Sequence, residues 1–169
     1  MDHVIQNDEC IDLNIAAGRL KDNYQTEWAE SVKAKPKLRI YEKHKKKIEP
    51  ERYLTSNLPK YNRSLIAQLR FGILPLRIET GRYVNEQIGE RLCTLCNMQE
   101  VEDEYHFLLH CNKYTAEREL LLQDLHINRT EFSHLENIDQ STTIMNNIHI
   151  FGNYLGQIFN IRRKTMYHS

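Results

Sequence analysis

A cluster of cysteine and histidine residues between positions 91 and 111 constrains this chain more than any other feature. The segment reads RLCTLCNMQEVEDEYHFLLHC and contains three of the four cysteines in the 169-residue sequence. Its spacing is C-x2-C-x9-H-x4-C. A C-x2-C turn places two sulfur atoms on one side of a tight loop, where one tetrahedral ion can bind both. Because thiolate and imidazole ligands favour zinc over hard cations, the spacing predicts a zinc site.

The predicted ligands of the Zn2+ ion are Cys93, Cys96, His106 and Cys111. His110 directly precedes Cys111, and adjacent side chains rarely point toward the same ion, so His106 is the favoured imidazole ligand. The fourth cysteine, Cys10, is remote in the sequence and is expected to be a small, half-buried side chain. A chance cluster of buried thiols and a disulfide are the alternatives that the pattern leaves open.

The predicted coordination sphere is closed, which bears on catalysis. Catalytic zinc keeps an open position for water, whereas four protein ligands leave none. We therefore expect the metal to supply folding free energy, on the order of 10 kcal/mol for small zinc modules, and we expect that the chain is not an enzyme. An acid between the ligand pairs could bind the imidazole of His106. A solvated loop is nevertheless the favoured interpretation for any one of the four acids: Glu100, Glu102, Asp103 and Glu104.

The composition is that of a folded intracellular protein. Hydrophobic residues make up 40% of the sequence, which is enough for a core. No run approaches the roughly 18 apolar residues that a membrane span needs. The N-terminal residues MDHVIQNDECIDL lack the apolar stretch of a signal peptide. We therefore expect nuclear or cytoplasmic residence and no contact with membranes.

Apolar periodicity predicts a mainly α fold, a small helical domain with an embedded CCHC zinc-stabilised loop and a long C-terminal helix. Helices are expected at 61–72, 113–126 and 130–138, the last of them with Thr130 as its N-cap. A first helix is expected over residues 9–33, and its apolar face is formed by Leu13, Ala17, Leu20, Tyr24 and Trp28.

The C-terminal segment carries an apolar stripe from Ser141 onward, at Ile144, Ile148, Phe151, Leu155 and Ile158. This heptad-like stripe could dock on the N-terminal helix or on another chain, and docking within the chain is favoured. Gly152 and Gly156 lie inside the pattern and argue against a straight helix. We divide the chain into an N-terminal helix with a basic segment (1–60), a helix with the CCHC module (61–126) and a C-terminal helical segment (127–169).

Basic residues are unevenly distributed, although the net charge is zero. Residues 33–47, KAKPKLRIYEKHKKK, contain eight lysines or arginines and one glutamate. Such a run can attract a phosphate backbone, but the solvated side of a helix is the favoured interpretation. Basic and aromatic residues also interleave farther along, as in surfaces that stack bases, although packing and snorkelling within the chain are the commoner outcome for such side chains. The predicted phosphate contacts are Lys35, Lys37, Arg39, Lys43, Lys45, Lys46, Arg70, Arg77 and Arg82, and the predicted stacking residues are Tyr41, Phe71 and Tyr83.

Three blocks of the sequence together resemble a known family. The blocks KPKLRIYEKHK, SLIAQLRFGILPLRIETGRY and ERLCTLCNMQEVEDEYHFLLHC resemble the C-terminal zinc-binding region of non-LTR (LINE-type) retrotransposon reverse transcriptases of animals. In that family a Gly-Arg pair, here Gly81 and Arg82, precedes the C-x2-C. An acidic pair, here Glu102 and Asp103, then precedes the final histidine and cysteine. The resemblance covers roughly residues 20–125.

The resemblance implies an accessory tail that binds RNA or DNA but lacks the polymerase and endonuclease domains. The paired aspartates of the polymerase, in a Tyr/Phe-x-Asp-Asp setting, do not occur in this sequence. The alternative is a structural or protein-interaction zinc module without nucleic-acid binding, a truncated or co-opted remnant. The zero net charge favours this alternative, as does the prospect of self-association through the C-terminal helix.

Overall fold

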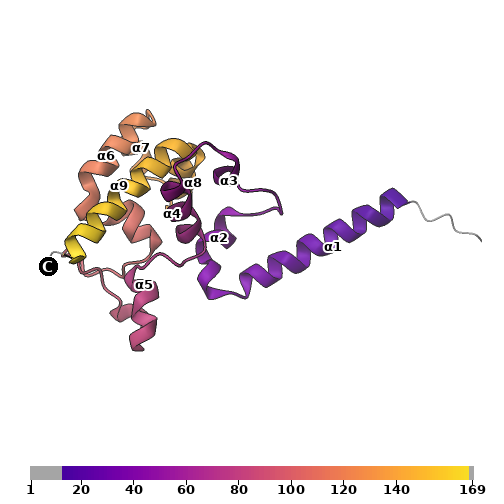
Figure 1. The fold of residues 1–169 in the computed structure, drawn as a ribbon, viewed down its shortest axis with the longest axis horizontal. Helices are drawn as coiled ribbons and strands as arrows, with labels where there is room; N and C mark the ends of the chain where they lie inside the picture. Colours follow the sequence, from indigo (N-terminus) through magenta and orange to yellow (C-terminus); the bar gives the residue numbers. More distant parts are fainter. Residues whose placement is uncertain (1–12, 168–169) are drawn as a thin grey trace, which may run out of the picture.

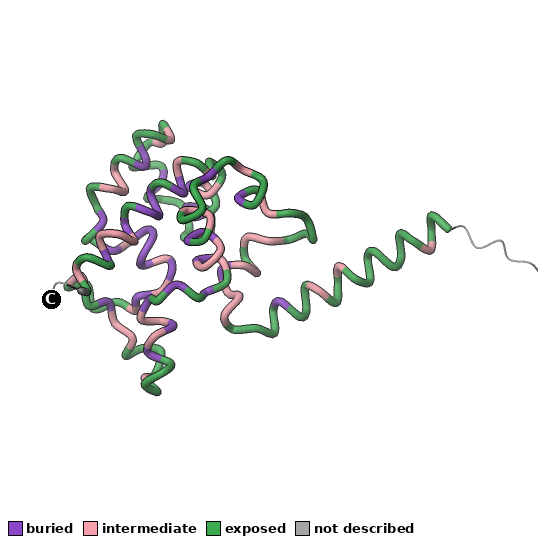
Figure 2. The backbone as a smooth tube through the Cα atoms, viewed as in Figure 1, coloured by how far each residue is buried: buried purple, intermediate pink, exposed green. Residues whose placement is uncertain are grey.

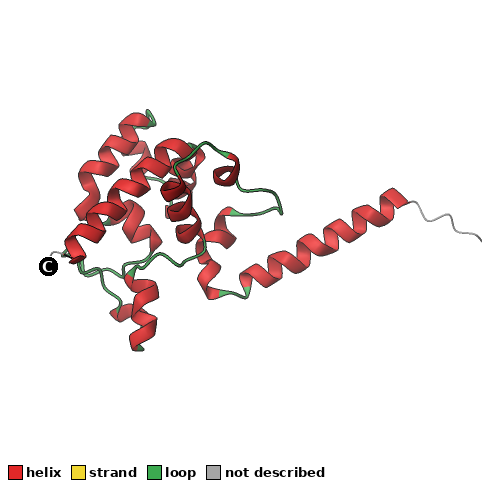
Figure 3. Cartoon of the chain, viewed as in Figure 1, coloured by secondary structure: helices red, strands yellow, loops and turns green. Residues whose placement is uncertain are grey.

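Helices predicted from apolar periodicity pack around one core in the computed structural model, which describes residues 13–167 (Figure 1). Figure 3 shows no strand within this range, and none of its helices is long and apolar enough to cross a membrane. The predicted mainly α fold with a long C-terminal helix is confirmed. The α-helices are α1 (Leu13–Lys33), α2 (Arg39–His44), α3 (Arg52–Thr55), α4 (Lys60–Arg70), α5 (Arg77–Thr80), α6 (Thr115–Asp124), α7 (Arg129–Ser133), α8 (Asn137–Asn146) and α9 (Ile148–Tyr167).

The core is centred on the contact between α4 and α9. Gly152 and Gly156 make this contact close. A Cβ atom at Gly152 would lie 3.2 Å from the Leu58 side chain, and one at Gly156 would lie 3.0 Å from the Asn62 amide. The two glycines therefore serve helix packing, which explains their place inside a regular apolar pattern. Six side chains of this contact are at most 2% exposed: Leu65, Ile66, Leu69, Phe151, Leu155 and Ile158.

The C-terminal pattern is divided into two helices rather than one. Asn147 has an extended backbone (φ −95°, ψ 92°), and its side-chain oxygen accepts a hydrogen bond from the Ile150 amide at 3.2 Å. Such a side-chain cap ends one helix and begins the next. Docking within the chain, the favoured expectation, is confirmed. The N-terminal helix is the wrong partner, however, because α9 packs on α4, α6 and α8.

The apolar face of α1 is exposed over most of its length, as Figure 2 shows. Leu13, Leu20 and Tyr24 are 80%, 70% and 63% exposed. Only the C-terminal end of α1 contacts the core, where Val32 is buried and Trp28 meets Tyr41 edge to face at 6.2 Å. The predicted helix is therefore confirmed from Leu13 to Lys33, but its stripe does not join the core. Residues 9–12 of the predicted helix, with Cys10, lie outside the described residues.

The remaining helices form where they were expected, with shifted ends. The segment predicted at 61–72 is α4, and that predicted at 113–126 is a short 3-10 turn (Asn112–Tyr114) followed by α6. The prediction of Thr130 as an N-cap is wrong. The side chain of Asn128 accepts hydrogen bonds from the amides of Thr130 and Glu131, so Asn128 caps α7, and α7 ends at Ser133. Asn128, two residues before Thr130, thus accepts the hydrogen bonds of the free amides at the start of the helix, the role that was expected of Thr130.

Candidate metal centre

The two cysteines of the C-x2-C pair lie in a small hairpin loop. Leu92 and Val101 form an antiparallel bridge, and the amide of Cys93 donates to the Glu100 carbonyl at 2.8 Å. Gln99 adopts the left-handed conformation (φ 58°) that turns the chain back. The loop closes with Cys93 and Cys96 on its inner side.

The other two predicted ligands are joined by one wide helical turn. The amide of Cys111 donates to the carbonyl of His106 at 2.7 Å, a bond between residues five apart. Residues 106–110 thus form a π-helical turn, a conformation that recurs at functional sites. In an α-helix, residues five apart point in different directions. The wider turn places the side chains of His106 and Cys111 on the same side of the helix. Two residues with the H-x4-C spacing can therefore bind one ion.

The four predicted ligands converge on one point. Their ligand atoms all lie within 4.8 Å of one another. The sulfur atoms of Cys93 and Cys111 are 4.0 Å apart, and the sulfur of Cys96 is 3.4 Å from Nε2 of His106. Three of the four side chains are buried, and Cys96 is half-buried. A single metal ion can therefore reach all four groups. His110 lies outside the cluster and its Nε2 bonds the Asn137 side chain at 2.9 Å.

The close approach of the thiols changes their acidity in the metal-free protein. The hydrogen bond between Cys111 and Cys93 lowers the pKa of the Cys93 thiol and raises the pKa of the Cys111 thiol. Burial raises the pKa of Cys96. Burial also opposes a charge on His106, but contacts with Cys93 and Glu100 outweigh it and raise the pKa of the imidazole. Three thiolates can coexist here only when a cation compensates their charge.

The acids between the ligand pairs are structured. Nδ1 of His106 donates to the Glu100 carboxylate at 2.9 Å, and the amide of His106 donates to Asp103 at 2.8 Å. The first bond fixes the tautomer that directs Nε2 toward the cysteines. A solvated loop is therefore the wrong interpretation for these acids. Glu102 and Glu104 are only 1% and 2% exposed.

Two buried carboxylates tie the metal loop to the rest of the fold. Glu102 accepts two bonds at 2.9 Å from the Arg162 guanidinium of α9 and one at 2.8 Å from the amide of Arg77. Glu104 accepts two bonds from Arg39 of α2. Sequence reasoning missed Arg162. The signal was present, because Arg162 follows Leu155 and Ile158 at steps of three and four and so continues the buried stripe of α9.

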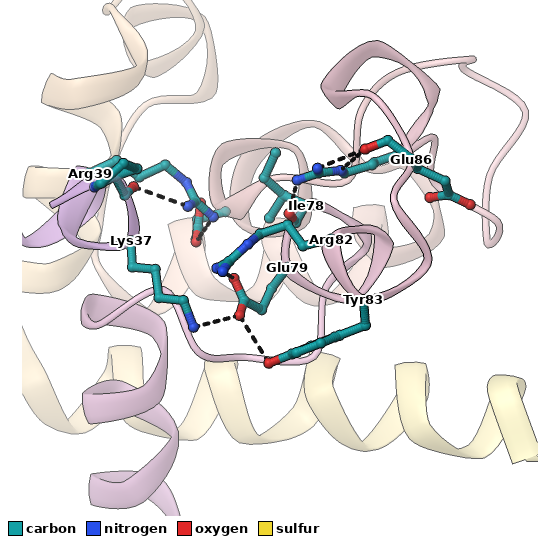
Figure 4. Close-up of polar contacts among 10 residues, drawn as sticks. Lys37, Arg39, Ile78, Glu79, Arg82, Tyr83 and Glu86 are labelled. Atoms are coloured by element: carbon teal, nitrogen blue, oxygen red, sulfur yellow. Dashed lines mark hydrogen bonds and ion pairs between the residues drawn. The ribbon is translucent and has the colours of Figure 1, made fainter.

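Most of the predicted phosphate contacts already have carboxylate partners. Figure 4 shows Lys37, Arg82 and the hydroxyl of Tyr83 meeting at Glu79, with distances of 2.8, 2.9 and 3.3 Å. Glu79 is 4% exposed, and although burial opposes its charge, the two cations lower its pKa. The other paired cations among the predicted contacts are Arg39 with Glu104, Arg77 with Glu86, and Lys45 and Arg70, both with Glu51.

Two of the three predicted stacking residues pack against each other within the chain. Tyr41 and Phe71 stack on each other, with ring centroids 5.3 Å apart and planes inclined by 22°. One face of each ring is therefore covered. Tyr83 is 74% exposed. The structure thus brings two of the three predicted stacking residues together. The third, Tyr83, lies in the 3-10 turn Gly81–Val84 that follows α5, where its hydroxyl bonds Glu79 and its ring stays exposed.

Cations without a carboxylate partner, as far as the described residues show, gather at the end of α2. Lys43 lies over the ring of Tyr105 with its nitrogen 5.0 Å from the centroid, and Lys46 donates to the Glu42 carbonyl at 2.9 Å. Lys47 follows and is exposed. Lys35, on the other side of α2, contacts Ser31 at 3.4 Å. Within the basic run, the segment 43–47 therefore keeps three lysines without a carboxylate partner in the described part of the chain, Lys43, Lys46 and Lys47, whereas Lys45 is paired with Glu51.

Comparisons with known proteins identify no relative of this chain. A scan of protein-family models and searches of curated proteins and of solved structures found no match to this chain. What the chain itself shows is a mainly α fold that brings three cysteines and one histidine close enough to bind a metal ion.

Proposed function

We propose that this chain is a zinc-stabilised, non-catalytic module that binds nucleic acid through residues 43–47. The observation that carries the proposal is the gathering of three lysines without carboxylate partners in a chain whose other predicted cations are mostly paired. Exposed cations that release counterions from a phosphate backbone supply affinity without sequence preference. Because RNA and DNA both have a phosphate backbone, both can make such contacts.

Zinc is the metal that the donor set supports. Three thiolates and one imidazole are a frequent structural zinc set, whereas hard cations take oxygen ligands. In a tetrahedral zinc site with bonds of about 2.3 Å, two sulfur atoms lie about 3.8 Å apart. The 4.0 Å between Cys93 and Cys111 agrees with that geometry. Because the four protein ligands complete the coordination, the metal would hold the loop rather than activate water.

The resemblance to reverse-transcriptase tails extends this proposal. In that setting the module would be the accessory zinc-binding tail of a non-LTR retrotransposon reverse transcriptase, and it would hold nucleic acid for a polymerase elsewhere. The support is the order of the shared residues, from Gly81 and Arg82 through the cysteines to the final histidine. Catalysis is not part of the proposal.

Salt dependence tests the nucleic-acid contact. We expect log affinity for a single-stranded RNA to fall linearly with log salt, and the variant Lys43→Gln/Lys46→Gln/Lys47→Gln to flatten the slope by about 2, because each lost phosphate contact removes about 0.7. Fluorescence anisotropy across salt concentrations measures both slopes. Arg77→Gln is the matched control, since Arg77 is paired with Glu86 and should leave the slope nearly unchanged. A flat slope for the natural chain would remove the proposal.

The exposed face of α1 supports a second candidate, self-association of two copies through this helix. The N-terminal half of α1 carries Arg19 and Lys21 against Asp22, a net charge of +1, and the C-terminal half carries Glu27 and Glu30 against Lys33, a net charge of −1. An antiparallel pair would therefore place cations of one copy opposite acids of the other, with the leucine stripe between them.

Sedimentation distinguishes this candidate. We expect a monomer–dimer equilibrium at micromolar concentration that Leu20→Glu abolishes, because the stripe would then carry a buried charge. Ile15→Glu is the control, since Ile15 is 55% exposed and two positions from Leu13, on another face of the helix. A natural chain that stays monomeric at high micromolar concentration contradicts the self-association.

A further inference from the structure

A cationic cleft lies between the segment after α2, the N-terminal end of α3 and α8. It encloses about 350 Å³. Five cations line it, against two acids, Glu49 and Glu51, which leaves a net charge of +3. The cations are Lys45, Lys46, Lys47, Arg52 and Arg70. A cleft of this sign concentrates anions.

Two half-buried cations of the cleft, Lys45 and Arg70, share the carboxylate of Glu51, and Lys45 also donates to the Glu49 carbonyl at 2.5 Å. Glu51 lies 3.3 Å from the nitrogen of Lys45 and 3.3 Å from a terminal nitrogen of Arg70. Charge-assisted bonds are normally about 2.7–2.9 Å long, so both contacts are long. Nε of Arg70 is buried and has no hydrogen-bond partner within the described residues. This nitrogen has almost no accessible surface, so an anion in the cleft would meet the terminal nitrogens of the guanidinium instead. The guanidinium also lies over the ring of Tyr41, with its carbon 5.4 Å from the centroid, and an oxyanion would add a closer charged partner than Glu51.

The electrostatics around His44 report the same excess of positive charge. Burial, together with Arg70, Lys46 and Lys43, lowers the pKa of His44 to about 4. Its two ring nitrogens lie 3.1 and 3.2 Å from the hydroxyls of Ser141 and Thr142. The ring is therefore held neutral at the wall of the cleft, and α8 fixes its orientation.

We propose that this cleft binds a phosphate group, with Arg70 at its floor and Lys47 and Arg52 at its rim. The inference rests on the proposed nucleic-acid binding, because the phosphate group that we expect in the cleft is the terminal phosphate of an RNA or DNA strand. A terminal phosphate carries about −1.5 to −2 charges at pH 7 and three acceptor oxygens. It thus matches the net +3 cleft better than a diester, which carries one charge.

Two binding measurements on the zinc-loaded full chain test the site. The first compares a single-stranded RNA bearing a 5′-phosphate with the same RNA bearing a 5′-hydroxyl, by fluorescence anisotropy. We expect the 5′-phosphate to tighten binding roughly tenfold or more, the value of one or two bonds to charged groups. The second titrates inorganic phosphate and follows the Nε–H resonance of Arg70 by NMR. We expect that resonance to shift and saturate.

Variants at the rim separate binding from folding. Lys47→Gln/Arg52→Gln alters two exposed side chains and should abolish the preference for the 5′-phosphate while the protein stays folded. Lys113→Gln is the control, because Lys113 is exposed and lies outside the cleft.

The outcomes distinguish the cleft from the proposed function. If both RNAs bind equally and the Arg70 resonance does not move, the phosphate site is overturned and nucleic-acid binding stands. If neither RNA binds but inorganic phosphate shifts the Arg70 resonance, the phosphate site stands with a free phosphate as its ligand. The proposed function then falls.

Discussion

Replacing His106 by alanine is expected to unfold the protein and abolish metal binding. Structural zinc contributes on the order of 10 kcal/mol or more, which is comparable with the entire stability of a domain, about 5–15 kcal/mol. Inside the loop, between the ligand pairs, Leu92 and Val101 form one bridge, and the ion pairs of Glu102 and Glu104 hold only the end of the segment next to His106. His106 also leads directly into Phe107 and Leu108, which are fully buried in the core. Loss of the metal therefore exposes the core as well as the loop.

The chain offers a matched control in its second histidine. His110 lies four residues from His106 but binds Asn137 rather than the cysteine cluster, so His110→Ala should keep one zinc per chain and a nearly unchanged thermal transition. Zinc content by atomic absorption and unfolding by circular dichroism measure both properties. A chelator should reproduce the effect of His106→Ala on the natural chain. A folded, zinc-containing His106→Ala variant would overturn the assignment of the site.

Replacing Arg162 by methionine is expected to lower the free energy of unfolding by about 3–5 kcal/mol, the usual effect of breaking a buried ion pair. Arg162 and Glu102 are 6% and 1% exposed and form two hydrogen bonds. Without Arg162, Glu102 keeps only the amide of Arg77 as a partner, and an uncompensated buried carboxylate remains. Burial opposes the charge on Arg162, but its hydrogen bonds to the Glu102 carboxylate raise the pKa of the guanidinium. Urea unfolding of the zinc-loaded protein measures the difference.

A double variant shows whether the uncompensated charge is the cause. Arg162→Met/Glu102→Gln removes both charges and should recover most of the loss, because the penalty belongs to the carboxylate left alone. Arg129→Met is the surface control. Arg129 pairs with Glu119, but their side chains are 72% and 43% exposed, so its loss should be at most about 1 kcal/mol. The idea fails if Arg162→Met has no greater effect than Arg129→Met.

The four residues that can bind a metal ion and the longer helices followed from local sequence pattern, whereas the short helix α5 and the separate helix α8 did not. Ligand spacing is a local property, because Cys93 and Cys96 share one hairpin loop, and His106 and Cys111 share one turn. Helix formation in α4 and α9 is likewise local, since apolar residues three and four apart define the buried face. The break at Asn147 was not foreseen, because the apolar stripe continues across it while the backbone does not.

Long-range charge pairing was decided only by the tertiary structure. Arg39 and Glu104 are 65 residues apart, and Arg162 and Glu102 are 60 apart, so composition and spacing cannot reveal that they meet. For this reason the predicted phosphate contacts included six cations that the fold pairs with carboxylates. The same folding brings Lys46, Lys47 and Arg52 to one cleft beside Arg70. Local spacing thus determined the metal ligands, whereas packing decided which charges remain available to a partner, since an ion pair forms only where two distant segments are brought into contact.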